Sequence, residues 1–543
     1  MMYLLTALVP LLAISSAAPT SSPYTVRAPT GYYTGAPDTN FSNVRAFLSV
    51  PYGQDTSGSN RWLPPQSVPL SSNAFNVTAM PPACPQYVSA VPAIWNQQIP
   101  QYLQVWGNAN NSAGESAIFT TEDCLKLAIW TPHNATSSSH LPVAMFWTGG
   151  GLQTNGIDVP IQLPAGWVNR TQSHIVVTIN YRMNIMGFPN AAGLYDQNLG
   201  LMDQRLALEW VRDNINHFGG DASRVMIWGQ SSGAVSVDYA NYAYWDDPIA
   251  HAIFAESGSA LHTAPWADNS NFTFVAQNVG CNYPTNASAE LECMRGVPYA
   301  NIINFMGQYQ DNSTLRAPMQ PAISFGAVPD ERLVFENVTE RYEMGFVTKV
   351  PMIYSSVANE GGSLQRYPVN DPYNGTNQTA ANAITTGFAL CPAADTTKLR
   401  HSIGLPTYRY QYAGNWTNQD PLPWMGAFHS SDLAMLMGSY PDGNGRPCCE
   451  PLEVETANAM QDYVYSFMVD PWDGPPSMGW YPMDPTAADW GQMLRFGARG
   501  KAVQNVTGFE VEAVCYGQGY LQSLPMSSKG PVSSGAALKE GEV

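Results

Sequence analysis

Continuous apolar runs and one amphipathic segment define the middle of the chain. Residues 142–147 and 175–179 are almost wholly apolar, which is typical of strands buried on both faces of a parallel sheet. Between residues 201 and 217, apolar side chains recur at helical spacing and predict a helix with one buried face. Residues 225–228 form another short apolar run, and a helix-like run begins at Ala234. This alternation predicts an α/β fold with a mainly parallel sheet covered by helices.

Weaker patterns flank this region. The chain before it is rich in Gly, Pro, Ser and Asn, which predicts short strands and turns. After it, residues 350–357 and 407–413 are further strand candidates, and the Ser- and Gly-rich residues 525–543 predict a disordered tail. A length of 543 residues permits three or more domains. Because no clear linker interrupts the chain, we expect one domain over residues 18–524.

The N-terminus predicts a targeting segment. An apolar stretch runs from Tyr3 to Ile14 and is too short to cross a bilayer. Ser15 and Ala17 suit the −3 and −1 positions of a cleavage site, so we expect a signal peptide over residues 1–17. The alternative is an apolar N-terminal strand. No other stretch is apolar enough for a transmembrane anchor, and the C-terminus lacks the tail that a lipid anchor needs.

Charge and cysteine content indicate the setting. The formal net charge is −18 although only 12% of residues are charged, and such a chain has no net positive charge to displace counterions from nucleic acid. Eight cysteines suit an oxidising compartment, and 13 N-x-S/T sequons suit a glycosylated surface. We therefore expect a secreted, extracellular glycoprotein. The candidate glycosylation sites are Asn40, Asn76, Asn110, Asn134, Asn169, Asn271, Asn286, Asn312, Asn337, Asn374, Asn377, Asn415 and Asn505.

Two glycine motifs follow predicted strands. Residues 229–233 read G-Q-S-S-G, a pattern that places a serine hydroxyl on a sharp turn between a strand and a helix. Ser231 is therefore a candidate nucleophile, and the alternative is a helix-capping serine. Residues 149–151 are three glycines after a strand, where backbone N–H groups can form an oxyanion hole. The alternative for these glycines is a flexible turn.

A serine nucleophile needs a base and an orienting carboxylate. His429 lies in a loop of aromatic and small residues, and Glu360 follows the strand candidate 350–357. The chain order Ser231, Glu360, His429 is the order expected for an α/β-hydrolase. The alternatives are an ordinary loop histidine and a solvated turn acid. The chain contains no zinc motif, Walker loop or dinucleotide fingerprint, so we expect neither a metal nor a cofactor.

Ordered motifs along nearly the whole chain resemble the type-B carboxylesterase/lipase family, which includes cholinesterases and secreted fungal lipases. These motifs are Phe47–Tyr52, Arg61–Pro65, Glu122–Leu125, Asn180–Arg182, Gly187–Phe188, Asn198–Leu201, Asp203–Gln204, Phe218–Asp221, Ser257–Ser259 and Asn359–Gly361. The resemblance implies an α/β-hydrolase fold with a large, mostly parallel central sheet, flanking helices and long loop insertions.

The resemblance also implies roles for single residues. Ser231 would be the nucleophile, His429 the general base and then general acid, and Glu360 the residue that orients the imidazole. The backbone N–H groups of the remaining site residues would form the oxyanion hole; these residues are Gly150, Gly151 and Ser232. The activity implied is hydrolysis of a carboxylic ester through an acyl-enzyme.

Cysteine pairing and the lid follow from the same resemblance. It implies the disulfides Cys84–Cys124 and Cys281–Cys293. Four cysteines remain, namely Cys391, Cys448, Cys449 and Cys515, and three pairings of them are possible. The pair between the adjacent Cys448 and Cys449 is the least favoured on geometric grounds.

The loop between Cys84 and Cys124 is the candidate lid and carries Tyr87, Trp95, Tyr102, Val105 and Trp106. Trp424 and Phe428 are candidate pocket residues, with core packing as the alternative.

The chain departs from the family pattern close to the proposed nucleophile. Thr148 precedes the glycines, where the family often has His or Tyr. Leu152 follows them, where the family usually has Phe. Gln230 replaces the common Glu before the nucleophile, and Ser232 replaces the usual Ala after it. Because the oxyanion donors are backbone groups, we expect the hole to survive. Gln230 removes an anion that would favour the imidazolium form of His429.

The expected function is a secreted serine hydrolase acting on small-molecule or lipid esters, with contact to a lipid surface left open. Two alternatives remain. One is a non-catalytic, cholinesterase-like binding protein, since fold alone does not fix function. The other is an esterase dedicated to one specialised metabolite. The presence of all three triad residues favours an enzyme.

Overall fold

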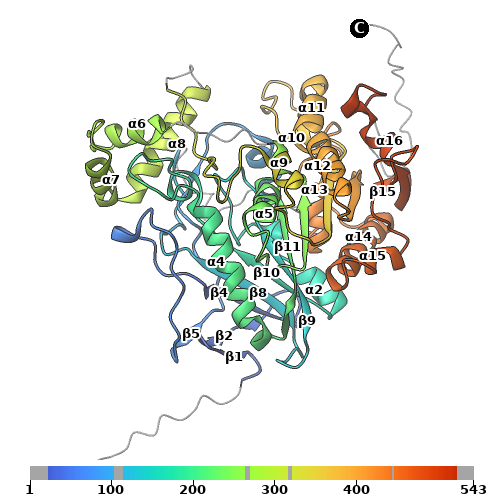
Figure 1. The fold of residues 1–543 in the computed structure, drawn as a ribbon, viewed down its shortest axis with the longest axis horizontal. Coiled ribbons are helices and arrows are strands. Elements are labelled where there is room, and N and C mark those ends of the chain that lie inside the picture. The colour runs from blue at the N-terminus through green and yellow to red at the C-terminus, as the bar shows by residue number, and fades with distance from the viewer. Residues whose placement is uncertain (1–21, 103–113, 263–268, 316–320, 443–444, 522–543) are drawn as a thin grey trace, which may run out of the picture.

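The computed structural model describes residues 22–102, 114–262, 269–315, 321–442 and 445–521. Predictions for residues 1–17 and 525–543, and for Asn110, Val105 and Trp106, lie outside this part of the chain. The described residues contain an 11-stranded sheet in the order β16-β15-β14-β13-β12-β11-β9-β10-β8-β4-β3 (Figure 1). The strands are β3 (Ala36–Pro37), β4 (Val44–Pro51), β8 (Lys126–Pro132), β9 (Leu141–Trp147), β10 (Ile175–Ile179), β11 (Gly220–Gln230), β12 (Ala252–Glu256), β13 (Met352–Val357), β14 (Thr407–Tyr412), β15 (Gln492–Ala498) and β16 (Lys501–Thr507).

The middle of this sheet is parallel and its margins are antiparallel. Neighbouring strands from β10 through β15 pair in parallel. The pairs β10–β8, β8–β4, β4–β3 and β15–β16 are antiparallel. The predicted α/β fold is therefore confirmed, and the carboxyl ends of the parallel strands meet at one edge, where such sheets place their ligand sites. Three further strands, β1 (Thr25–Ala28), β2 (Gly31–Thr34) and β5 (Ala74–Asn76), form a small separate sheet.

Each face of the sheet is covered by helices because both faces are apolar. On β9, Val143 and Met145 join one core cluster, whereas Ala144 and Phe146 join the other, as the alternation of side chains along a strand requires. The first cluster includes residues of α4 (Leu199–Asn214), α5 (Ser232–Ala243) and α12 (Cys391–Ser402). The second includes residues of α2 (Ala165–Thr171), α13 (Ser431–Met437) and α14 (Pro451–Val469).

The remaining helices lie around this core. Helices α6 (Ser270–Asn278), α7 (Ala287–Gly296) and α8 (Tyr299–Leu315) gather at the upper left of Figure 1 around an apolar cluster of their own. The others are α1 (Ile94–Gln97), α3 (Asn184–Gly187), α9 (Val338–Glu343), α10 (Glu360–Ser363), α11 (Gln378–Ile384), α15 (Gly474–Ser477) and α16 (Gly508–Glu512). Among the described residues, no helix has the length and apolarity needed to cross a membrane.

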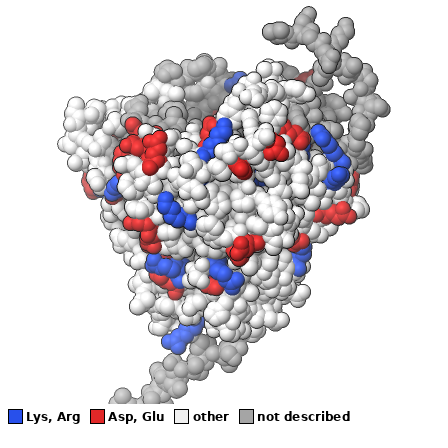
Figure 2. Space-filling view, turned by 45° about the vertical axis from the view of Figure 1, so that its right-hand side comes forward, with Lys and Arg blue, Asp and Glu red and all other residues white. Residues whose placement is uncertain are grey.

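The predicted elements differ from the observed ones mainly at their ends. The helix expected over residues 201–217 is α4, which begins at Leu199 and passes into a 3₁₀ turn at Ile215–Phe218. The strand expected over 225–228 is part of β11, which spans Gly220–Gln230. Gly220 also pairs with β9, and the register shifts between Gly220 and Val225. Acidic and basic side chains form small scattered groups on the mostly uncharged face of Figure 2, which matches the low charged fraction.

Candidate active site

The candidate nucleophile lies at the carboxyl edge of the sheet. Strand β11 ends at Gln230 and helix α5 begins at Ser232, so Ser231 makes the turn between them. Its backbone has φ 57° and ψ −123°, a positive φ that a residue with a Cβ rarely adopts. A Cβ on Gly229 would meet the carbonyl of Gly233. Glycine is therefore required for the backbone to turn this sharply.

The glycine run passes directly against this turn. A Cβ added to Gly149 would lie 2.9 Å from the Cβ of Ser231. Gly150 and Gly151 have φ values of 106° and 66°, so both adopt backbone conformations that suit glycine. Farther along the loop, the N–H of Leu152 donates to Oγ of Ser232 at 3.1 Å. The structure thus brings Gly150, Gly151 and Ser232 together beside Ser231.

The candidate base and carboxylate form a direct bond. Glu360 begins α10, just after β13, and its Oε1 accepts the backbone N–H of Val357 at 2.9 Å. Its Oε2 lies 2.5 Å from Nδ1 of His429. The Glu360 side chain is fully buried and that of His429 is 4% exposed. Because a carboxylate only accepts hydrogen bonds, Nδ1 carries the proton and Nε2 is the basic nitrogen.

Backbone contacts hold the two loops of this pair together. Asn359 donates its backbone N–H to the carbonyl of Ala427 at 2.9 Å. Its side-chain amide donates to the carbonyls of Trp424 and Met425, at 3.0 and 2.8 Å. Asn359 directly precedes Glu360, so these bonds fix the distance between the carboxylate and the loop that carries His429.

Nε2 of His429 faces the turn that carries Ser231. The amide nitrogen of Gln230 lies 3.2 Å from Nε2. The described hydrogen bonds do not include one between Ser231 and His429, and bonds of this kind often tighten only when substrate binds. On its other side, the imidazole contacts the ring of Phe388 at 5.3 Å between ring centroids. The imidazole is therefore enclosed by Glu360, Gln230 and Phe388.

Two further acids lie near this arrangement and were missed from the sequence. Glu256 ends β12 opposite Gln230 in register, and its carbonyl accepts the N–H of Ser231 at 2.9 Å. Asp432 lies in the first turn of α13, three residues after His429. Both are fully buried. The sequence offered one weak signal for each acid: Glu256 ends a strand, and Asp432 lies three residues after the candidate histidine.

The candidate lid packs against the histidine loop. Phe428 is fully buried, with its ring centroid 5.2 Å from that of Tyr102 and 6.3 Å from that of Trp95. Tyr102 also donates its hydroxyl hydrogen to Oε1 of Gln419 at 2.9 Å. Trp424 donates its indole N–H to the carbonyl of Pro372 at 2.7 Å. Phe428 directly precedes His429, so its packing on Trp95 and Tyr102 connects the candidate lid with the histidine loop.

Comparison with known proteins identifies the family of this chain. A sequence profile of the Carboxylesterase family matches residues 22–379. The chain belongs to the carboxylesterase family. It is 36% identical to chlorogenic acid esterase of Aspergillus niger over 87% of this chain and 90% of that protein. It is 32% identical to secreted lipase 5 of Gibberella zeae over 88% of this chain and 91% of the relative. The family recognised from the motifs is confirmed, and the protein is a carboxylic ester hydrolase.

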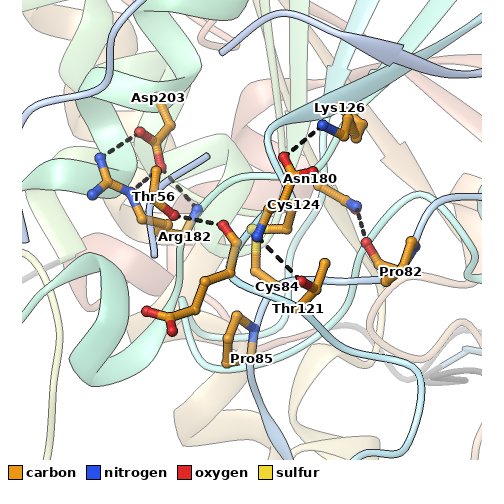
Figure 3. Close-up of a disulfide and its surroundings, with 12 residues drawn as sticks. Thr56, Pro82, Cys84, Pro85, Thr121, Cys124, Lys126, Asn180, Arg182 and Asp203 are labelled. Atoms are coloured by element: carbon orange, nitrogen blue, oxygen red, sulfur yellow. Dashed lines mark hydrogen bonds and ion pairs between the residues drawn. A yellow bond between two sulfur atoms is a disulfide. The ribbon is translucent and has the colours of Figure 1, made fainter. Parts of the chain in front are cut away.

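The disulfides of this carboxylesterase differ in one respect from the sequence expectation. The structure joins Cys84 to Cys124 and Cys281 to Cys293, the two pairs that the family resemblance implied. Figure 3 shows the first pair beside Asn180, whose amide donates to the carbonyl of Pro82 at 3.0 Å, and beside the buried ion pair of Arg182 and Asp203. These contacts fasten the start of the candidate lid to the loop after β10.

The pairing of the last four cysteines differs from the one that geometry favoured. Cys391, at the start of α12, pairs with Cys515, with 5.3 Å between their Cα atoms. The adjacent Cys448 and Cys449 form the remaining disulfide, so the geometric preference against this pair was wrong. The same two residues and Glu453 are the group of possible metal ligands found in the described chain. Both sulfur atoms are already bonded to each other, so this group gives no support for a metal site.

The sequons of the carboxylesterase fall into distinct environments. Most described candidates are exposed; these are Asn40, Asn76, Asn134, Asn286, Asn337, Asn374, Asn377 and Asn505. Three others are half-buried, namely Asn169, Asn312 and Asn415. Asn271 is buried, and its amide donates to the carbonyl of Ser324 at 3.0 Å. Glycosylation at Asn271 stays a prediction, and this residue differs from the exposed sequons in its burial.

Proposed function

We propose that this carboxylesterase is a secreted serine hydrolase that cleaves carboxylic esters through Ser231, His429 and Glu360. The observation that carries the proposal is the 2.5 Å bond between Glu360 and Nδ1 of His429, which directs Nε2 toward the turn bearing Ser231. A buried carboxylate of this kind orients the imidazole and stabilises the imidazolium that forms during the reaction.

The first half of the reaction forms an acyl-enzyme. Ser231 attacks the ester carbonyl while Nε2 of His429 accepts its hydroxyl proton. The carbonyl oxygen becomes an oxyanion, and in this proposal the backbone N–H groups of Gly150, Gly151 and Ser232 donate to it. Each such donor contributes about 10²–10³ in turnover. When the tetrahedral intermediate collapses, His429 gives the proton to the departing alcohol.

The second half releases the acid. Water loses a proton to Nε2 of His429 and attacks the acyl carbonyl. The same backbone groups hold the new oxyanion, and the proton returns to Oγ of Ser231 as the acid leaves. Glu360 stays ionised throughout, because its role is to hold Nδ1–H and to balance the imidazolium charge.

We propose export and a one-domain organisation from separate observations. A signal peptide at residues 1–17 is supported by the sequence pattern, by the disulfides and by relatives whose names include secreted lipases. Residues 18–524 form the single hydrolase domain in this proposal, since the central sheet contains strands from Ala36 to Thr507. Mass spectrometry of the exported protein would identify its first residue and its occupied sequons.

The substrate class follows from two kinds of relative. One is named chlorogenic acid esterase and another is named a secreted lipase, and each aligns over about nine-tenths of its own length. We propose a small-molecule or lipid ester, admitted past the loop between Cys84 and Cys124. A chain-length series of nitrophenyl esters, a chlorogenic ester and a triglyceride emulsion would separate these possibilities.

The catalytic assignment is tested with Ser231→Ala. Substitution of the nucleophile should lower kcat by at least about 10³, because only binding and the oxyanion donors remain. A fluorescent phosphonate should label wild-type protein at Ser231 and leave the variant unlabelled. Ser236→Ala, one helical turn further into α5, is the matched control and should retain both labelling and turnover. Folded Ser231→Ala protein with substantial esterase activity would rule out the assignment.

A further inference from the structure

Two buried carboxyl groups lie beside the candidate triad without a basic partner. Glu256 is on β12 and Asp432 is in the first turn of α13, and both side chains are inaccessible to solvent. Among the described residues, neither forms an ion pair with Lys, Arg or His. Two adjacent anions in such a site would carry a large desolvation and repulsion cost.

Their hydrogen bonds show how this cost is avoided. Oε2 of Glu256 accepts the indole N–H of Trp228 at 2.6 Å, and Oδ2 of Asp432 accepts the hydroxyl hydrogen of Tyr410 at 3.0 Å. The other oxygens, Oε1 and Oδ1, receive no N–H or O–H group from the described residues. The two side chains instead bond to each other. Carboxylate oxygens only accept, so this bond requires one carboxyl group to carry a proton.

We infer that Glu256 and Asp432 share one proton near neutral pH, and that the resulting single negative charge lies at the end of the loop that carries His429 and positions this loop. The inference rests on the proposed function, because it assigns a role relative to His429. Asp432 is joined to β12 through Glu256 and to β14 through Tyr410. The start of α13, three residues beyond His429, is thereby fixed to two strands of the sheet.

The electrostatics of the surroundings agree with a shared proton. Burial, followed by the charge of Asp432, raises the pKa of Glu256 well above its ordinary value. Burial raises the pKa of Asp432 to about 6. The charge of Glu360 on α10 raises both of these pKa values. The hydroxyl of Tyr410 on β14 also faces the pair. Because the pKa of Glu256 is raised well above its ordinary value and that of Asp432 only to about 6, Glu256 is the partner that holds the proton.

Amide substitutions can imitate each state of the pair. In Glu256→Gln, the amide oxygen can still accept from Trp228 while the amide nitrogen donates to Asp432. In Asp432→Asn, the amide donates to Glu256, which then keeps the charge. Each single variant therefore retains one bond and one negative charge but no shared proton. The double variant has neither a charge nor a carboxylate acceptor.

The shared proton is measured through the pH dependence of stability. Carboxyl groups of the unfolded chain ionise near pH 4, whereas the folded pair keeps a proton above that pH. Folding therefore binds a proton at this pair, and the contribution of the pair to stability falls as pH rises from about 4 toward neutral. We expect the Tm of each single variant to fall less than that of wild type between pH 5 and pH 8, by about 2–4 °C. Glu209→Gln and Asp462→Asn make the same changes at partly exposed carboxylates and should keep the wild-type slope.

The influence of this negative charge on His429 is measured through the pH dependence of kcat/KM. Loss of a nearby anion disfavours the imidazolium form, so the acid limb of the kcat/KM profile should move to lower pH by about 0.5–1 unit in the double variant. It should stay in place in both single variants, which retain one charge. If Asp432→Asn fails to fold, Glu256→Gln alone decides the stability test, since it replaces the proton-bearing partner by its neutral isostere.

The outcomes separate this inference from the proposed function. Equal Tm slopes in wild type and the single variants would overturn the shared proton. An unmoved acid limb in the folded double variant would overturn its influence on His429. Absence of phosphonate labelling at Ser231 in wild-type protein would instead overturn the proposed function, and it would leave the stability result unaffected.

Discussion

The amide nitrogen of Gln230 lies 3.2 Å from Nε2 of His429. The residue that directly precedes the proposed nucleophile therefore contacts the ring nitrogen that must accept its proton. This contact is neutral, although the family often has a glutamate at this position. We therefore expect the charge of the side chain at residue 230 to influence the pH dependence of catalysis.

Replacing Gln230 by Glu introduces an anion next to Nε2. Because a neighbouring negative charge favours imidazolium, and catalysis requires the neutral ring, the acid limb of kcat/KM should move to higher pH by about 1 unit. A pH–rate profile on a nitrophenyl ester measures this shift. Gln518→Glu makes the same change at an exposed position and should leave the profile in place. An unchanged acid limb in Gln230→Glu would show that residue 230 does not influence the base.

Ser232 supports the glycine loop through its side chain. Its Oγ accepts the N–H of Leu152 at 3.1 Å, one residue after Gly151. In Ser232→Ala, loss of this bond should cost about 1 kcal/mol of loop positioning and lower kcat about five-fold with little change in KM. The control is Ser236→Ala, because Oγ of Ser236 bonds within α5 to the carbonyl of Ser232. Equal kcat values for wild type and Ser232→Ala would contradict this role.

His174 predicts sensitivity to acid. Burial lowers its pKa from 6.5 to about 3, while its Nδ1 lies 2.7 Å from Oγ1 of Thr171. The unfolded chain binds a proton here below about pH 6.5 and the folded chain does not, so the contribution of His174 to stability falls as pH decreases from about 6.5 to about 3. His174→Asn should reduce this fall in Tm, whereas His140→Asn at an exposed histidine should not. Parallel pH–Tm curves for His174→Asn and wild type would contradict the assignment.

Asn377 combines a sequon with a helix cap. Its side-chain oxygen accepts the N–H of Ala380 at 3.1 Å at the start of α11, which leaves the amide nitrogen for a glycan. Asn377→Ala should lose about 1 kcal/mol of local helix stability, seen as roughly five-fold faster amide exchange at the start of α11. Thr379→Ala removes the sequon but keeps the cap, so it is the matched control. Equal exchange in the two variants would attribute the effect to the glycan.

The sequence predicted those parts of the molecule that depend on local pattern. The apolar runs identified the central strands, and chain order identified Ser231, Glu360 and His429 as candidates. The bond from Glu360 to His429 required the fold, since 69 residues separate the two. The pair of Glu256 and Asp432 was not predictable for the same reason, because neither acid forms a recognisable motif and their shared proton depends on contact across the sheet edge.

Pairing and burial were likewise beyond local reasoning. The preference against joining Cys448 and Cys449 considered the two residues alone, whereas packing of Cys391 against Cys515 determined which sulfurs remained. Asn271 satisfies the sequon pattern as well as any other site. Only its position within α6, against the carbonyl of Ser324, shows that its amide is already engaged.

Phe428 lies between the candidate lid and the proposed base. Its ring packs against Tyr102 of the loop that begins at Cys84, and its backbone continues directly into His429. In the proposed function, the same side chain therefore contacts both the candidate lid and the loop of the proposed base. Trimming Phe428 would remove a side chain that supports the loop of the proposed base, whereas trimming Trp95 changes the candidate lid and keeps the contact of Phe428 with Tyr102. Selection for a new substrate should therefore accumulate changes on the lid before it reaches the histidine loop.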